Sequence, residues 1–232
     1  TAWSGHFDVL GILFFAVSLY FLENGGRLMR YSGAGLFLGL SAMTKILPVV
    51  FFPHYYREVR GLAGRMIFTA GFFLPFLLYL FYIDAGWALI YSLKKYATEW
   101  VFSGLFYTLL RLTGFDGEVL RLVTGVIFSI AYIFVFFNNR NVREVIFLTL
   151  LALMVFSPVV HPWYTLWLIP FAGLKYFYTC SAFMLASFAN YEVLSGWFTA
   201  GIWSENPFIV VVGYLGAIGV FLYELRKGKD YA

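Results

Sequence analysis

The chain has 232 residues, of which 62% are apolar, 22% aromatic and only 12% charged, and its mean hydropathy is +0.81. Soluble domains are about 45–50% apolar and about 25% charged, so this composition excludes a water-soluble globule. The net charge of +4 comes from short basic clusters between apolar runs, a pattern typical of loops beside a membrane and not of a nucleic-acid-binding face. We therefore expect an all-α, polytopic transmembrane helix bundle with membrane lipid, and no nucleic acid, as a partner.

Seven apolar runs are predicted to cross the membrane, since about 30 Å of hydrocarbon takes about 20 helical residues. They cover residues 7–22, 66–83, 120–137, 145–159, 163–178, 180–197 and 207–225. The long connection at residues 84–118 has nearly balanced charge, and residues 88–100 and 102–112 within it have helical apolar spacing. We expect these two segments to be short external helices that lie in the membrane interface.

The run at residues 32–56 has two interpretations, because Lys45 lies in its middle and Pro48 follows within one turn. If residues 32–45 enter the membrane and 46–56 return, eleven Lys and Arg residues lie on one side and four on the other, leaving Lys45 aside; a single crossing gives nine and six. Basic residues of short loops gather in the cytoplasm, so we expect the re-entrant half-helix pair. The carboxyl end is then cytoplasmic, and the turn at Lys45 lines a cavity near the outer face.

Lys45 is the clearest candidate for a functional charge, because an ionisable side chain at membrane depth is costly and by default faces a site in the protein interior. Its ammonium group suits a phosphate oxygen. Two structural alternatives are open: the side chain extends to the lipid headgroups, or it forms a structural pair with a buried carboxylate.

The predicted external turn at His161-Pro162-Trp163-Tyr164 is a second candidate. The imidazole of His161 can donate to a phosphate or move a proton near neutral pH. Trp163 and Tyr164 can stack on a sugar, or they can belong to the aromatic belt at the lipid boundary. Trp167 follows at helical spacing, so we expect the aromatic face to continue down the next helix.

His6 and Asp8 lie at the external mouth of the first predicted crossing. Asp8 is equally suited to cap a helix that begins at Val9. Glu192 is a further charge in an apolar run, and we interpret it first as a polar contact between helices. The sequence contains no metal-binding, phosphate-loop or cofactor motif, so we expect no cofactor and no metal site within these residues. A metal held by a carboxylate cluster before Thr1 stays an open alternative.

Five segments share an order and spacing with a known family. They are Gly5-His6-Phe7-Asp8 before a Leu-rich helix, Arg27 to Arg30, Gly33-Ala34-Gly35-Leu36-Phe37-Leu38-Gly39-Leu40 leading to Lys45 and Pro48, Glu99-Trp100-Val101-Phe102-Ser103-Gly104-Leu105-Phe106, and Ser157-Pro158 through His161-Pro162-Trp163-Tyr164 to Trp167 and Pro170. In this order the chain resembles the GT-C superfamily of polyprenol-phosphate-sugar-dependent glycosyltransferases. Within it, the chain is most similar to the prokaryotic integral-membrane mannosyltransferases.

The resemblance implies transfer of a hexose, expected to be mannose, from a polyprenyl-phosphate-linked donor to a glycan or lipid-glycan acceptor. The transfer would invert the anomeric carbon and take place on the outer face of a bacterial or archaeal plasma membrane. The general base of the family is an external-loop carboxylate, which we expect before Thr1. Residues 1–232 are then expected to be a single transmembrane domain, the carboxyl-terminal part of a longer enzyme.

The same resemblance assigns roles to the candidate residues. Lys45 and His161 are expected to come together at the donor phosphate, because a phosphate leaving group needs cationic stabilisation. His6 and Asp8 would lie at the mouth of the cavity, and Trp163 would contact the sugar or the prenyl chain together with Tyr164.

Two other functions stay open at this point. A transporter or lipid flippase would place charges at membrane depth but needs a polar path to both sides, which would run through Glu192. A noncatalytic relative that binds polyprenyl lipids fits a chain without the family's catalytic carboxylate.

Overall fold

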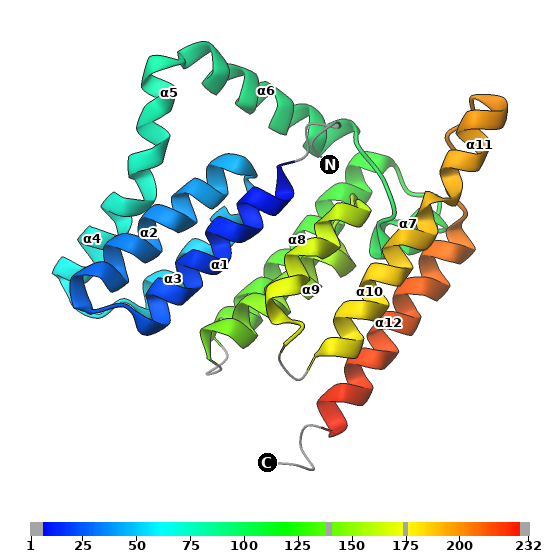
Figure 1. Ribbon diagram of the computed structural model, residues 1–232. Coiled ribbons are helices and arrows are strands. Elements are labelled where there is room, and N and C mark those ends of the chain that lie inside the picture. The colour runs from blue at the N-terminus through cyan, green and yellow to red at the C-terminus, as the bar shows by residue number, and fades with distance from the viewer. Residues whose placement is uncertain (1–6, 138–140, 174–175, 228–232) are drawn as a thin grey trace. The chain divides into compact units, whose positions relative to one another are not determined.

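The computed structural model describes residues 7–137, 141–173 and 176–227 (Figure 1). Within these ranges the chain is all-α, apart from isolated bridges that join Phe102 and Ser103 to Val159. Contacts between helices divide it into two compact units, Thr1–Lys94 and Lys95–Ala232. The expectation of a single transmembrane domain stays a prediction.

The first unit is built around two antiparallel helices that lie side by side, α1 and α2 (Figure 1). Two buried hydroxyl groups join them: Ser18 Oγ donates to the carbonyl oxygen of Ala34 at 2.6 Å, and Ser41 Oγ donates to that of Gly11 at 2.7 Å. The elements of this unit are α1 (Asp8–Asn24), α2 (Arg27–Thr44), the 3-10 helix η2 (Leu47–Phe51), α3 (Phe52–Glu58), α4 (Leu62–Phe73), η3 (Leu74–Leu77), α5 (Leu78–Phe81) and the start of α6 (Ile83–Glu99), which continues into the second unit.

Helix α2 also packs against α4 at a very short distance, because glycines line the contact. A Cβ atom at Gly35 would lie 2.2 Å from the carbonyl oxygen of Phe68, and one at Gly39 would lie 2.2 Å from that of Phe72. Small residues four positions apart let helix backbones approach closely inside a membrane. The contact therefore requires glycine at both positions.

The second unit contains two antiparallel pairs, α8 with α9 and α10 with α12 (Figure 1). Near the end of α12, the buried carboxylate of Glu224 accepts the backbone N–H groups of Tyr178 at 3.1 Å and Thr179 at 2.9 Å. These N–H groups belong to the first turn of α10 and have no acceptor within that helix. Besides the end of α6, the elements are α7 (Leu105–Arg111), α8 (Gly117–Phe137), α9 (Val142–Phe156), η4 (Pro162–Phe171), α10 (Phe177–Ala189), η5 (Asn190–Glu192), α11 (Val193–Ala200) and α12 (Pro207–Lys227).

Among the described residues, three helical stretches are long and apolar enough to cross a membrane: Leu62–Phe81, which joins α4, η3 and α5, then Gly117–Phe137, and Pro207–Lys227. At most 22% of the residues in each apolar window are buried, so most of these apolar side chains face outward, as lipid contact requires. They match three of the predicted crossings. The other crossings and the side of each loop stay predictions.

Two segments differ from the sequence-based expectation. The crossing predicted at 163–178 is not one α-helix: η4 is a 3-10 helix of 10 residues, and α10 begins only at Phe177. Pro170 lies inside η4 and has no N–H to give to an α-helical ladder. At the predicted re-entrant pair, α2 ends at Thr44, as the prediction required, but α2 has 18 residues and is about 27 Å long, which exceeds a half-helix. The turn inside the membrane stays a prediction.

Candidate functional site

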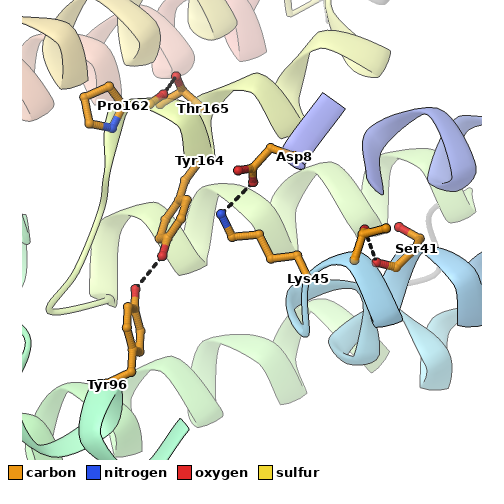
Figure 2. Close-up of polar contacts among 8 residues, drawn as sticks. Asp8, Ser41, Lys45, Tyr96, Pro162, Tyr164 and Thr165 are labelled. Atoms are coloured by element: carbon orange, nitrogen blue, oxygen red, sulfur yellow. Dashed lines mark hydrogen bonds and ion pairs between the residues drawn. The ribbon is translucent and has the colours of Figure 1, made fainter. Parts of the chain in front are cut away.

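The first cluster of candidate residues is an ion pair between Asp8 and Lys45. Asp8 begins α1 and Lys45 follows α2, and the antiparallel packing of the two helices brings these ends together. Lys45 Nζ lies 2.6 Å from Asp8 Oδ1 (Figure 2). The Asp8 side chain is 4% exposed and that of Lys45 is 22% exposed. A charge that is removed from water is stabilised when a counter-charge accompanies it, and here the two charges compensate each other.

Asp8 does not cap its helix, which corrects one of the sequence-based alternatives. The helix begins at Asp8 itself, and Phe7 holds the cap position without a side-chain bond. A carboxylate in the first turn still interacts favourably with the helix dipole. The carboxylate also orients the ammonium group of Lys45, which is the structural pair that the sequence left open for this lysine.

The second cluster surrounds His161, whose imidazole is enclosed by aromatic rings. It stacks with Trp163 at a centroid distance of 4.3 Å and with Phe102 at 4.9 Å. Trp100 and Tyr164 meet the same ring edge-on, at 6.0 and 5.5 Å. His161 is 8% exposed, so this imidazole lies in an apolar, aromatic environment.

Backbone pairing brings two distant motif segments together around His161. The N–H of Phe102 donates to the carbonyl oxygen of Pro158 at 3.0 Å, and the N–H of Val160 donates to that of Phe102 at 2.7 Å. Gly104 permits this approach, because a Cβ atom there would lie 2.7 Å from the carbonyl oxygen of Ser157. The segments 99–106 and 157–164, both quoted for the family resemblance, are thus neighbours in space.

Tyr164 connects this cluster to the end of α6. Its hydroxyl group shares a hydrogen bond of 2.8 Å with that of Tyr96 (Figure 2). Burial, and then the neighbouring Tyr164, raise the pKa of Tyr96, so the Tyr96 phenol is a neutral hydrogen-bonding group. Arg121, at the start of α8, fixes the same end of α6 by donating to the carbonyl oxygens of Ala97 at 3.2 Å and Trp100 at 2.8 Å.

The predicted aromatic face changes because η4 is a 3-10 helix. With three residues per turn, Tyr164 and Trp167 are one turn apart, whereas Trp163 points elsewhere. Trp167 is fully buried and belongs to the core, while Trp163 and Tyr164 are half-buried. Trp163 and Tyr164 are the two that remain accessible to a ligand.

A third group of polar residues was not singled out as a site from the sequence. Glu205, in the loop before α12, accepts the N–H of Ser103 at 2.8 Å. Ser103 is fully buried with φ 54, and its Oγ accepts from Asn190 Nδ2 at 2.6 Å and contacts the Tyr214 hydroxyl at 3.3 Å. Burial raises the pKa of Glu205 above its ordinary value; Ser103 and Arg111 oppose the rise, and a second carboxylate, that of Glu192, adds to it. The serine inside the motif 99–106 was the one available signal.

Glu192, where the sequence suggested a helix contact, serves as a local backbone anchor. Its Oε1 accepts the N–H of Asn206 at 2.8 Å, which fixes the loop between α11 and α12. In the described part of the chain, His, Cys, Asp and Glu side chains form no group of three that could hold a metal ion.

The predicted site residues therefore fall into two groups. Asp8 and Lys45 meet in the first unit, and His161, Trp163 and Tyr164 meet in the second. The prediction that Lys45 and His161 contact one phosphate stays a prediction. His6 lies outside the described residues.

No protein-family model, curated protein sequence or solved structure matches this chain. The resemblance to membrane glycosyltransferases therefore depends on the motifs themselves.

Proposed function

We propose that this chain is the carboxyl-terminal part of a multi-pass membrane glycosyltransferase. It would move a hexose, expected to be mannose, from a polyprenyl-phosphate-linked donor to a glycan or lipid-glycan acceptor on the outer face of a prokaryotic plasma membrane. The observation that carries the proposal is the pairing of Phe102 with Pro158 and Val160, because it joins two of the motif segments around one histidine. Helices apolar enough to span a membrane are also what a prenyl-linked donor requires.

The donor phosphate is proposed to contact Lys45 and His161. When the acceptor hydroxyl attacks the anomeric carbon, the bond from that carbon to the phosphate oxygen breaks and negative charge develops on the phosphate. A preorganised ammonium group and an imidazole N–H stabilise that charge, an interaction typically worth about 10²–10³ in rate per donor. The proton of the acceptor hydroxyl passes to the general base that the resemblance places before Thr1.

The aromatic residues are proposed to hold the sugar or the first prenyl units. Trp163 and Tyr164 are half-buried beside His161, so a ligand that reaches the imidazole also touches these rings. Asp8 has a positioning role in this scheme, because its carboxylate fixes the ammonium group of Lys45.

The test is a transfer assay with the full-length protein in lipid nanodiscs and a radiolabelled polyprenyl-phosphate hexose. We expect Lys45→Ala and His161→Ala each to lower the transfer rate by roughly 100-fold. Lys95→Ala is the matched control, because Lys95 is 51% exposed and pairs only loosely with Glu99 at 3.9 Å, so its rate should stay at the wild-type value. Undiminished transfer by both Lys45→Ala and His161→Ala would refute the assignments.

A further inference from the structure

The second unit contains a pocket of about 570 Å³ that the proposed donor site does not use. Its walls come from α7, from the loop before α12 and from the start of α12. The polar groups and the aromatic ring that matter here are Thr108, Arg111, Trp203, Ser204 and Glu205. A pocket of this size with few convergent polar groups is typical of small-molecule sites.

Glu205 is held in this pocket by a buried and strained support. Its carboxylate accepts the N–H of Ser103 at 2.8 Å. Ser103 has a φ of 54, a left-handed conformation that is unfavourable for a residue with a Cβ atom. Asn190 and Tyr214, both buried, hold the Ser103 hydroxyl in place. Backbone strain of this kind persists only where the surroundings enforce it, and it concentrates at functional sites.

The charges of the pocket select the chemistry of its ligand. Arg111 lines the pocket together with Glu205. Glu192 does not line the pocket, but its negative charge acts on the carboxylate of Glu205. An anion would meet the Glu205 carboxylate, and a cation would meet the Arg111 guanidinium. A neutral ligand rich in hydroxyl groups satisfies both, because each hydroxyl can donate to a carboxylate and accept from a guanidinium.

Trp203 adds the flat apolar surface that such a ligand also needs. It lines the pocket and is 49% exposed, so part of its ring is open to a ligand. A sugar ring presents C–H groups on one face and hydroxyl groups around its edge. An aromatic ring beside a carboxylate and a guanidinium therefore complements a saccharide better than it complements a flat aromatic or a fully apolar molecule.

We propose that this pocket binds a neutral saccharide, with Glu205 accepting from its hydroxyl groups, Arg111 donating to them and Trp203 lying against the face of the sugar ring. Phe102 links the pocket to the His161 cluster: it packs 5.7 Å from Trp203 and 4.9 Å from His161, measured between ring centroids. The bound saccharide is thus the acceptor glycan, an identification that rests on the proposed function; saccharide binding itself does not.

The test measures saccharide binding directly, by saturation-transfer NMR with the full-length protein in nanodiscs. The probes are methyl α-D-mannopyranoside and α-1,2-mannobiose. We expect Glu205→Gln, which keeps an acceptor for the Ser103 N–H, to weaken binding by roughly tenfold, since charge-assisted hydrogen bonds are about twice as strong as neutral ones. Trp203→Leu removes the flat aromatic surface against the sugar ring and should also weaken binding by roughly tenfold. The matched controls are Glu118→Gln and Trp87→Leu, which change exposed residues outside the pocket and should bind as the wild type does.

Two results would overturn the saccharide site. One is equal binding by the wild type, Glu205→Gln and Trp203→Leu. The other is displacement of the probes by inorganic phosphate at millimolar concentration, which would make the pocket an anion site.

The transfer assay separates this inference from the proposed function. Saccharide binding that depends on Glu205, without any transfer from a polyprenyl-phosphate hexose, would support the pocket and refute the glycosyltransferase. Transfer with unaltered acceptor saturation in Glu205→Gln and Trp203→Leu would refute the assignment of the acceptor glycan to this pocket and support the enzyme.

Discussion

Replacing both members of the ion pair between Asp8 and Lys45 should cost less than the sum of the costs of replacing each one alone. At 2.6 Å and an effective dielectric constant of about 20, the attraction between the two charges is about 6 kcal/mol, and most of it offsets their desolvation. Lys45→Met removes the ammonium group that lies 2.6 Å from the carboxylate of Asp8, which is only 4% exposed. Loss of one partner of a buried pair costs about 3–5 kcal/mol, and the 22% exposure of Lys45 lowers our expectation to about 2–4 kcal/mol.

The assay is a double-mutant cycle with Lys45→Met, Asp8→Asn and the double variant. Unfolding free energies are measured by denaturant titration in detergent micelles, followed by circular dichroism. We expect the double variant to be less destabilised than the sum of the single variants by about 1–3 kcal/mol. The matched control is the exposed pair of Lys95 and Glu99, which lie 3.9 Å apart on one helix and should show a coupling of at most about 0.5 kcal/mol.

Additive effects of Lys45→Met and Asp8→Asn would refute this reasoning. The same result would follow if water or lipid headgroups solvated the lysine, which is the headgroup alternative that the sequence left open. A coupling as small as that of the control pair would therefore assign Lys45 to the membrane surface and not to a protected pair.

Three further predictions concern other parts of the fold. Gly39→Ala should destabilise the first unit by about 1–3 kcal/mol, because the new Cβ atom meets the carbonyl oxygen of Phe72. The control Gly219→Ala lies in open space on α12 and should stabilise the chain by up to about 1 kcal/mol. Denaturant titration measures both free energies of unfolding. Glu205 has a raised pKa, so the folded chain holds the proton of this carboxyl group more tightly than the unfolded chain does. The resulting stabilisation is present below pH 4.5, and it is lost as the pH rises through the raised pKa of the folded state. Thermal unfolding scans should show this decline in the wild type and a flatter profile in Glu205→Gln. Glu224→Gln should cost about 1–2 kcal/mol, measured as a lower melting temperature, because the first turn of α10 loses a charged acceptor.

Local patterns predicted where α1 lies and where α2 ends, but not the full length of α2. Asp8 and Lys45 stood out because charges are rare in apolar runs, and Lys45 with Pro48 after it indicated the end of α2 at Thr44. The sequence did not pair these two side chains, because the pairing depends on antiparallel packing of α1 against α2 over a separation of 37 residues. The close contact between α2 and α4 could have been predicted, since Gly35 and Gly39 form the G-x-x-x-G spacing of packed membrane helices.

Prediction was weaker around His161, for a reason that lies in the backbone. Apolar aromatic residues at 163–171 fit an α-helical crossing by composition alone, but Pro170 removes a hydrogen bond from that ladder and η4 winds with three residues per turn. This change moves Trp163 off the face shared by Tyr164 and Trp167. It leaves Trp163 stacked on His161, a contact that helical periodicity does not describe.

Residues from four parts of the chain build the saccharide pocket and its support, and this explains why composition and spacing gave so little sign of it. Glu205 is positioned by the N–H of Ser103, and Ser103 adopts a left-handed conformation that sequence spacing does not predict. Asn190 and Tyr214 enforce this conformation from two further helical segments. Each interaction is non-local, so the site exists only once α10 and α12 have packed beside the segment 99–106. The dependence has an experimental consequence: a substitution in the Ser103 support should alter saccharide binding through the position of Glu205, although none of the supporting side chains needs to touch the ligand.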